Sequence, residues 1–600
     1  MRYLLCLLVS IPLLLFSQVT RPVATNISGV VDYSTELVFT DAFKMCREWT
    51  TFDAEGSGPW DTGADVPMLD NGFPVEVPFD GGTGKPQKVR ALMVWDIDTA
   101  RPEGKYRLIV KGKGKVGLQF GADGIFDCPV DTLVDVYGNV SLSIEYSDKD
   151  DPIRDIRFIY PRYVHSFESQ TFHDDFLDFL KDFQCIRFMD WLRTNNSNVV
   201  SWSDRSAYNF YTQTLESGVA YEYITELSNL MHKDPWICIP HRADDDYIRQ
   251  LASFLKTHLD PGLKIYLEYS NEVWNGGFWQ HSEAAALAAA AGYTGTEWER
   301  AWKWTAKRSA DLFTIFEDEF GGNKRLYKII PSQAANSWLS NQIITYFEDP
   351  QYNPGGVRAD ALAIAPYFGG EVAQDVVAEG IVSSITVEEI VDRMEASLPV
   401  SFQWMLESKQ VAGDHGLELI TYEGGQHLVG TGGNENIEEL TEKLIAANHH
   451  PDLQDVYCQY FDYWYENAGG LFAHFSSHGG YSKWGSWGIK ENFADVNNPK
   501  YLAIRSCVFE HNDTNSSYNE IEDDASLILY PNPSAAGYFY LKGNIDNADL
   551  RITDLMGRPQ SYMIESASPG LMKIRTSTKG LLLVQVTKSG KTINLKHIQL

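Results

Sequence analysis

Strand-like and helix-like patterns of apolar residues alternate between residues 155 and 505. In residues 264–270, apolar and polar side chains alternate with a period of two, which is typical of a strand. Eight such runs are expected, at residues 156–160, 185–189, 236–240, 264–270, 326–331, 361–365, 417–422 and 470–475. Amphipathic helices are expected between them, for example at residues 172–183, 244–258, 282–291, 298–320 and 437–448. Because such alternation builds a parallel sheet, we predict an α/β fold whose residues 152–508 form a (β/α)8 TIM barrel.

The chain on both sides of the barrel is expected to be rich in β-structure. Residues 19–151 contain short alternating runs separated by Gly, Asp and Pro, which predict an N-terminal β-rich, sandwich-like region. Within it, the aromatics of residues 37–49 either reach a cleft or plug the fold. Residues 509–524 are polar and acidic and predict a linker. Residues 525–600 contain short strands that predict a small C-terminal β-sandwich.

The N-terminus has the pattern of a secretory signal peptide. Arg2 precedes an apolar run, residues 3–16, that is too short to span a bilayer comfortably. Residues 1–18 are therefore expected to be removed on export. No other segment resembles a transmembrane helix, so no membrane span is expected in the mature chain.

Six cysteines remain after the signal peptide, and none has the CxxC spacing of a metal site. Cys185 and Cys238 fall in hydrophobic runs and are expected to be buried apolar residues. A disulfide among the other cysteines stays open. Neither a metal nor a cofactor is expected.

Composition narrows the classes of partner. The 600 residues are enough for roughly three structural units. A net charge of −31 disfavours nucleic acids and anionic membrane surfaces, so neutral partners are expected. The chain also has 16 Trp and 31 Tyr, whose flat faces suit sugar rings, although large aromatics are also common in cores.

Two carboxylates stand where predicted strands become loops. Glu272 follows the fourth candidate strand and Glu423 follows the seventh. The catalytic groups of α/β barrels lie at the C-terminal ends of their strands, so barrel closure would bring the two side chains to one cleft. Retaining glycoside hydrolysis needs two carboxyl groups about 5 to 5.5 Å apart. The alternative for Glu272 is a place in the first turn of a helix, where the helix dipole favours an acid.

The sequence around these carboxylates resembles glycoside hydrolase clan A, the retaining (β/α)8 hydrolases. The resemblance covers about residues 155–505. It rests on Asn271-Glu272 with Glu268 four residues earlier, and on Thr421-Tyr-Glu-Gly424. It implies that Glu272 is the acid/base, that Glu423 is the nucleophile, and that Asn271 contacts the sugar hydroxyl next to the anomeric carbon.

The same resemblance implies further residues that bind substrate or support the nucleophile. Tyr367 matches a tyrosine that hydrogen-bonds the nucleophile, and either Trp484 or Trp487 matches the tryptophan beneath the sugar. Arg187 and His241 match positions that are often Arg and His in the clan. The surrounding sequence does not match one family closely enough to name a substrate.

Each supporting residue also has a structural alternative. Arg187 pairs equally well with Asp190 at the barrel rim, while Glu268, if it faces inward, is expected to be tied to Arg187. His241 is also placed to cap the next helix. Trp274 either stacks on sugar or packs its loop, and the glycines after it favour stacking.

The C-terminal region resembles the sorting domain of the type IX secretion system of Bacteroidetes. The similarity lies in Tyr530-Pro-Asn-Pro533, Asp554-Leu-Met-Gly557 and a Lys-rich end, although Leu582 stands where an aromatic is usual. This resemblance implies export by the type IX machinery and a protein that is secreted or fixed at the cell surface.

We therefore expect a secreted retaining glycoside hydrolase that cleaves a plant or algal polysaccharide with two glutamates. The first alternative is a catalytically inactive surface glycan-binding protein on the same fold, because a fold does not prove turnover. The second alternative is a structural adhesin, which would not account for two carboxylates at strand ends.

Overall fold

The computed structural model describes residues 21–56, 58–97, 100–511, 528–530, 538–542, 548–554, 558–568, 571–588 and 591–599. The chain divides into two units, Met1–Asn515 and Ser516–Leu600. The expected signal peptide, residues 1–18, lies outside the described residues, as do residues 512–524 of the expected linker. Residues 509–511, which were assigned to that linker, still belong to the helical end of the first unit.

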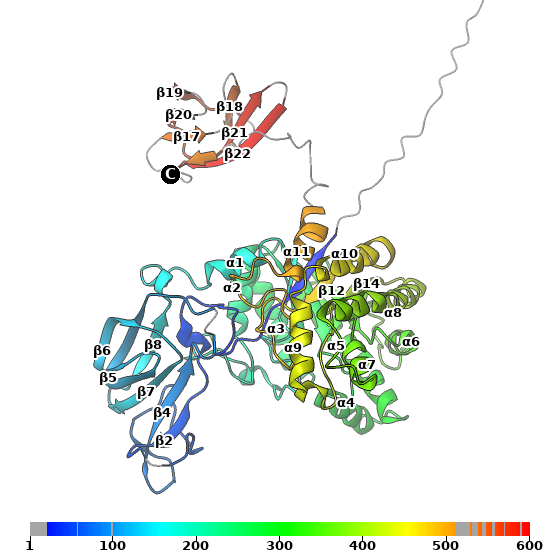
Figure 1. Ribbon diagram of the computed structural model, residues 1–600, viewed down its shortest axis with the longest axis horizontal. Helices are drawn as coiled ribbons and strands as arrows, with labels where there is room; N and C mark the ends of the chain where they lie inside the picture. The colour runs from blue at the N-terminus through cyan, green and yellow to red at the C-terminus, as the bar shows by residue number, and fades with distance from the viewer. Residues whose placement is uncertain are drawn as a thin grey trace, which may run out of the picture. The chain divides into compact units, whose positions relative to one another are not determined.

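Eight parallel strands form the centre of the first unit (Figure 1). In sheet order they are β14 (Glu418–Thr421), β13 (Ala361–Ile364), β12 (Leu326–Pro331), β11 (Ile265–Tyr269), β10 (Asp234–Ile239), β9 (Cys185–Arg187), β1 (Val23–Asn26) and β15 (Phe472–Phe475). The two end strands also meet. The Gly470 amide donates to the Leu419 carbonyl at 2.9 Å, and the Thr421 amide donates to the Leu471 carbonyl at 3.0 Å. The sheet is therefore a nearly closed (β/α)8 barrel, as the sequence pattern predicted.

The first barrel strand is not the one expected from the sequence. Residues 156–160 fall mainly in β8 (Arg154–Ile159), which pairs antiparallel with β5 (Lys105–Phe120) of the N-terminal sheet. The first barrel position is taken by β1, which lies between β9 and β15. The boundary expected between residues 151 and 152 is therefore wrong, because the β-rich region is inserted after β1. No helix follows β1 directly, so the βα pattern is interrupted there.

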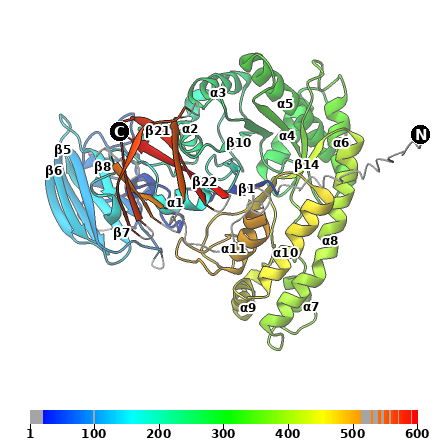
Figure 2. The ribbon, with the colours of Figure 1, turned by 90° about the horizontal axis from the view of Figure 1, so that it is seen from above.

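Helices surround the barrel, and Figure 2 shows α3, α5, α6 and α8 outside the strands. The helices are α1 (Asp174–Leu180), α2 (Tyr221–Met231), α3 (Asp245–His258), α4 (Trp279–Ala290), α5 (Glu297–Phe320), α6 (Ser337–Glu348), α7 (Val372–Ala378), α8 (Val387–Asp414), α9 (Glu438–Asn448), α10 (Leu453–Tyr463) and α11 (Pro499–Ile504). Two of them begin with reciprocal capping boxes, formed by Thr296 with Glu299 in α5 and by Thr386 with Glu389 in α8. In the part of the chain that is described, no helix is both long and apolar enough to cross a membrane.

The inserted β-rich region is a seven-stranded antiparallel sheet, built around one long strand. Its strands are β2 (Thr50–Asp53), β3 (Phe79–Asp80), β4 (Pro86–Met93), β5 (Lys105–Phe120), β6 (Gly124–Asp135), β7 (Val140–Ser147) and β8 (Arg154–Ile159). Strand β5 pairs with β6, β7 and β8, with register shifts along its length. Most aromatics of residues 37–49 are buried, and Trp49 stacks on Tyr211 with ring centroids 5.0 Å apart. This segment therefore packs the fold, and Phe39 and Lys44 also border a cavity of about 240 Å³ that does not include the two predicted carboxylates.

The C-terminal unit contains two small antiparallel sheets. One has β16 (Ile528–Tyr530), β17 (Tyr538–Lys542), β19 (Tyr562–Ser568) and β20 (Leu571–Thr576), and the other has β18 (Asp549–Asp554), β21 (Gly580–Lys588) and β22 (Lys591–Gln599). Side chains of both sheets share one core, which includes Phe539, Ile574, Ile552 and Leu582. The predicted C-terminal β-sandwich is therefore present. The Met556–Gly557 turn and residues 531–533 lie outside the described residues.

Within the described part of the chain, a disulfide joins Cys458 of α10 to Cys507, which follows α11. It joins positions 49 residues apart and ties the C-terminal end of the first unit to the barrel. Cys185 and Cys238 are buried free thiols in β9 and β10, as the sequence predicted.

Candidate active site

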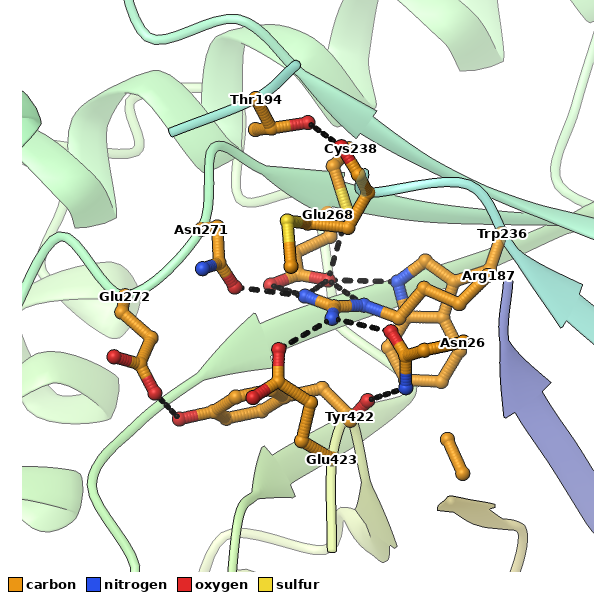
Figure 3. A network of polar contacts seen from close by, with 12 residues as sticks. Asn26, Arg187, Thr194, Trp236, Cys238, Glu268, Asn271, Glu272, Tyr422 and Glu423 are labelled. Carbon is orange, nitrogen blue, oxygen red and sulfur yellow. Dashed lines mark hydrogen bonds and ion pairs between the residues drawn. The ribbon is translucent and has the colours of Figure 1, made fainter. Parts of the chain in front are cut away.

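The structure brings the two predicted carboxylates together at the barrel mouth. Glu272 follows β11 and Glu423 follows β14 (Figure 3). The hydroxyl of Tyr422 donates to Oε1 of Glu272 at 2.9 Å, and Tyr422 directly precedes Glu423 in the chain. The two strand ends therefore share one polar network.

Arg187 at the end of β9 is the centre of that network. Its side chain is fully buried. Nη1 donates to Oε1 of Glu423 at 2.9 Å, and Nη2 donates to Oε2 of Glu268 at 2.9 Å. The expected tie between Glu268 and Arg187 is therefore confirmed. The alternative ion pair with Asp190 does not form, because the described ion pairs of Arg187 are with Glu268 and Glu423.

Glu268 holds the guanidinium of Arg187 in a fixed orientation. Arg187 donates to both oxygens of this carboxylate, and Nε1 of Trp236 adds a further hydrogen bond at 2.7 Å. Removing either member of such a buried pair leaves the other without a partner, which costs several kcal/mol, roughly 3 to 5. Glu268 therefore positions the arginine that contacts Glu423.

Each oxygen of Glu423 accepts a hydrogen bond. Oε1 accepts from Arg187, and Oε2 accepts from the hydroxyl of Tyr367 at 2.9 Å. The predicted contact between Tyr367 and Glu423 is therefore present. The next residue must be small, since a Cβ on Gly424 would lie 2.6 Å from the ring of Phe472.

Among the described residues, two neutral groups, Tyr422 and Asn275, donate hydrogen bonds to the carboxylate of Glu272. The side-chain amide of Asn275 donates to its Oε2 at 2.9 Å. Backbone strain marks this junction, because Ser270 has φ 61° and Glu272 has φ 44°. Non-glycine residues in the left-handed region are held there by the surrounding structure and are frequent at active sites. Glu272 therefore lies where a strand becomes a loop, as predicted. It does not lie in the first turn of a helix, because the next helix, α4, begins at Trp279.

The charges of the two carboxylates depend on each other. Burial raises the pKa of both Glu272 and Glu423, and the charge of Glu272 raises the pKa of Glu423 further. Arg187 acts in the opposite direction and lowers the pKa of Glu423. Two coupled carboxylates of this kind hold one proton between them over a range of pH. Arg187 also lowers the pKa of Glu272, but among the described residues it donates a hydrogen bond to Glu423 and none to Glu272.

Asn271 lies beside the carboxylates and is held at both ends of its amide. Its Oδ1 accepts from Nη2 of Arg187 at 2.9 Å, and its Nδ2 donates to Oδ1 of Asn195 at 3.0 Å. Gln280 donates to that same Asn195 oxygen and to the Asn271 carbonyl, both at 2.8 Å. The amide is therefore preorganised at the mouth of the barrel.

A cavity of about 300 Å³ opens next to Glu272. Trp274, Tyr367, Trp404 and His427 are among its lining residues. Aromatic walls with a few convergent polar groups are typical of small-molecule and sugar sites. Trp274 therefore borders the cavity instead of packing only within its own loop.

The two tryptophans after β15 have different surroundings. The ring of Trp487 lies 6.0 Å from that of Tyr367 and 5.0 Å from that of His427, measured between centroids. Trp484 is 67% exposed, and its carbonyl accepts a hydrogen bond from Nε1 of Trp487. Of the two tryptophans, Trp487 therefore lies beside Tyr367, which hydrogen-bonds Glu423.

His241 lies in a separate cluster. Its ring is hydrogen-bonded to Glu283, which also pairs with Arg242. His241 does not cap α3, because the N-cap residue of that helix is Asp244. Over the described ranges, no three His, Cys, Asp or Glu side chains are grouped as a metal site.

Several residues of the network were missed by the sequence analysis, and Asn26 and Tyr422 are the ones that link different strand ends. Asn26 ends β1, accepts a hydrogen bond from Arg187 at 2.9 Å and donates to the Tyr422 carbonyl at 2.9 Å. It was missed because β1 was not recognised as a strand. Tyr422 is the sequence neighbour of Glu423. Because successive side chains of a strand point to opposite faces, the sequence did not predict that both would reach the same site.

Comparisons with known proteins yield only distant structural similarity. No family model matches the chain, and no curated protein matches it. Among solved structures, it is similar to a modular endo-beta-1,4-mannanase of glycoside hydrolase family 26 from Cellulomonas fimi, with 9% identity, 69% of this chain and 85% of that chain covered, and a TM-score of 0.29. It is also similar to xylanase 10C from Cellvibrio japonicus, with 10% identity, 77% and 98% covered, and a TM-score of 0.33. A 4-O-alpha-L-rhamnosyl-beta-D-glucuronidase from Fusarium oxysporum has 11% identity, 70% and 89% covered, and a TM-score of 0.35. These values identify neither a family nor a substrate.

Proposed function

We propose that this protein is a retaining glycoside hydrolase that cleaves a plant or algal polysaccharide. The observation that carries the proposal is the asymmetric pair at the barrel mouth. Glu423 receives hydrogen bonds from the cation Arg187 and from Tyr367, whereas Glu272 receives them from the neutral Tyr422 and Asn275. Retaining hydrolysis needs one ionised and one protonated carboxyl group at the start of the reaction.

In the first step, Glu423 attacks the anomeric carbon and Glu272 protonates the departing glycosidic oxygen. The product of this step is a covalent glycosyl ester on Glu423, and the aglycone leaves with the proton. Arg187 and Tyr367 orient the attacking carboxylate through its two oxygens. Asn271 is placed to contact the hydroxyl next to the anomeric carbon, and Trp487 to support the sugar ring.

In the second step, Glu272 takes a proton from water, which attacks the same carbon. The ester bond to Glu423 breaks, and the sugar is released with its original configuration. The same side chain thus serves as acid and then as base. Its pKa must fall when Glu423 is esterified, because the charge of Glu423 no longer opposes ionisation of Glu272.

We also propose export, with release or attachment at the cell surface. The Cys458–Cys507 disulfide supports this, because such bonds persist in oxidising compartments. The signal-peptide pattern and the resemblance of the C-terminal β-sandwich to type IX sorting domains point the same way. Mass spectrometry of secreted protein from the native host tests this proposal. Mature chains should lack residues 1–18 and the C-terminal domain, and an intact Leu600 terminus would contradict the sorting role.

Digestion of a polysaccharide panel tests the activity. The enzyme should release reducing sugar from at least one plant or algal polysaccharide, and the sizes of the products then distinguish endo from exo action. Binding without release would favour the glycan-binding alternative, and neither binding nor release would favour a structural adhesin.

A further inference from the structure

Four aromatic residues lie at one end of the N-terminal antiparallel sheet, in the segment of the chain between β1 and β9. The register places Met93 at the end of β4 and Phe120 at the end of β5 opposite the same residue, Val140. Three loops that connect strands and the end of β5 meet at this end of the sheet. They carry the residues that we call the aromatic end: Trp60, Trp95, Phe120 and Tyr137.

Three rings of the aromatic end are in contact through Phe120, and the hydroxyl of Tyr137 donates a hydrogen bond to Asp123. Phe120 lies 6.1 Å from Trp60 and 5.6 Å from Trp95, measured between ring centroids. The guanidinium of Arg90 lies 3.6 Å from the centroid of Trp60 and covers that face of the indole. Trp60 is nonetheless 46% exposed to solvent.

The backbone is strained to hold these apolar rings in water. Phe120 has φ 71° and is 52% exposed, and the neighbouring Val94 and Asp96 both have φ 53°. Bulky and β-branched residues rarely adopt the left-handed region, and such strain is concentrated at functional sites. An exposed phenylalanine gains little from burial, so folding alone does not explain this conformation.

Hydrogen bonds tie the loops that carry Trp95 and Tyr137 to each other and to the end of β5. The Tyr137 amide donates to the Gly121 carbonyl at 2.7 Å. A Cβ on Gly121 would lie 2.1 Å from the carbonyl carbon of Gly138, so only glycine fits there. Asp96 and Asn139 exchange two hydrogen bonds of 2.8 Å. The aromatic end is therefore a preorganised surface, which lowers the entropic cost of binding.

We propose that the aromatic end is a second glycan-binding site, which holds a neutral polysaccharide chain apart from the barrel mouth. Exposed flat rings stack on the apolar faces of sugars, and the carboxylates of Asp96 and Asp123 at the rim are hydrogen-bond acceptors for hydroxyl groups. The same carboxylates, with the net charge of −31, disfavour an anionic glycan. The identity of the ligand rests on the proposed function, since the polysaccharide would be the one that the barrel cleaves.

Affinity electrophoresis of the full-length chain in gels containing soluble neutral polysaccharides tests this site. All variants are made in a Glu423→Gln background, so that the gel matrix is not digested. Trp60→Ala and Tyr137→Ala remove one ring each. Phe120→Asn removes the third ring, and asparagine tolerates the left-handed backbone, so this variant should melt no lower than its parent. Tyr146→Ala is the matched control, because Tyr146 is an exposed aromatic on β7 of the same sheet.

The Trp60→Ala change should weaken retardation by the polysaccharide about tenfold, which is the scale expected for losing an aromatic stacking contact. Phe120→Asn should weaken it similarly without loss of melting temperature. Turnover of a small aryl glycoside by Trp60→Ala in the active background should stay at the parental rate. If these variants lose no more affinity than Tyr146→Ala, or if only acidic polysaccharides retard the protein, the site is not a neutral-glycan site. Failure of the proposed function appears separately, as absence of turnover by the unmutated enzyme.

Discussion

Tyr422 and Glu272 are joined by a hydrogen bond of 2.9 Å from the phenol hydroxyl to Oε1 of the carboxylate. The bond links the end of β14 to the loop after β11, and Glu423 is the very next residue. A side chain that precedes one proposed catalytic carboxylate thus sets the position of the other. The proposed acid/base is therefore held from the strand end that carries the proposed nucleophile.

Changing Tyr422 to Phe should shift the pH dependence of the enzyme. The hydroxyl of Tyr422 lowers the pKa of Glu272, so its loss should raise that pKa and move the basic limb of kcat/KM to higher pH. Hydrogen bonds to charged groups contribute about 1.5 to 3 kcal/mol, so activity should also fall about tenfold or more. Tyr465→Phe is the control, because its hydroxyl binds the Pro22 carbonyl instead. An unchanged basic limb in Tyr422→Phe would show that this bond does not tune the acid.

Replacing Arg187 with Met should damage both stability and ionisation. Glu268 and Glu423 would lose their common cation, which should cost about 3 to 5 kcal/mol in denaturant unfolding. Because Arg187 lowers the pKa of Glu423, the acid limb of activity should move to higher pH. Adding Glu268→Gln should recover part of the lost stability, since it removes one uncompensated charge. Strictly additive losses would contradict a shared network.

Glu36 should make the fold less stable as pH rises. It is buried, accepts a hydrogen bond from Ser477 and is hydrogen-bonded to His478, and burial raises its pKa to about 8 from an ordinary value of 4.5. The folded protein therefore binds this proton more tightly than the unfolded chain does. The associated stability is complete below about pH 4.5 and is lost as pH rises toward 8.

Thermal unfolding of Glu36→Gln across this range checks that expectation. The neutral amide should make the protein less sensitive to pH, with a difference on the order of 4 kcal/mol between pH 5 and pH 8. Glu388→Gln, at an exposed helix position, is the control. Parallel curves for Glu36→Gln and the parent would show that Glu36 is not protonated in the folded state.

Removing the disulfide should destabilise the first unit. The bond closes a loop of 49 residues, for which loop entropy predicts about 4 kcal/mol. A Cys458→Ser/Cys507→Ser variant should lose up to that amount in denaturant unfolding, and reductant should produce the same loss in the parent. Reductant should have no effect on the variant. A parent that is insensitive to reductant would contradict a stabilising role.

Much of the barrel was predictable because seven of its strands are short apolar runs followed by helices. The strand at residues 264–270 illustrates this, since its inward side chains, Glu268 among them, alternate with outward ones. The first strand was not predictable from the same pattern. Val23–Asn26 has only four residues and leads into an inserted antiparallel sheet instead of a helix. It pairs with β9 and β15, which are far from it in the sequence, so no local pattern indicates this pairing.

The candidate site was predictable to the extent that its residues lie at strand ends. Glu272, Glu423, Asn271, Arg187 and Tyr367 do so. Hydrogen bonds join the last four, and Glu272 is joined to Tyr422. The role of Asn26 depends on a strand that the sequence does not reveal. The link from Tyr422 to Glu272 depends on the backbone of Ser270 and Glu272 in the left-handed region, which no local pattern indicates.

The roles of the two glutamates are the central claim, and the same substitution at each should have opposite consequences. Glu423→Gln should be inactive on every substrate, because an amide cannot replace the attacking carboxylate. Glu272→Gln should still form the glycosyl ester from an aryl glycoside whose leaving group needs no proton, and then stall. Glu371→Gln, which also borders the cavity, is the matched control and should retain activity.

The most direct measurement is the turnover of such an aryl glycoside by both variants, with and without azide, and the configuration of the product. Azide should restore Glu272→Gln, because it attacks the glycosyl ester without a base, and the glycosyl azide should have retained configuration. Azide should yield no retained product from Glu423→Gln. Rescue of Glu423→Gln to a retained product with none for Glu272→Gln would reverse the two roles, and parental activity in both variants would refute the mechanism.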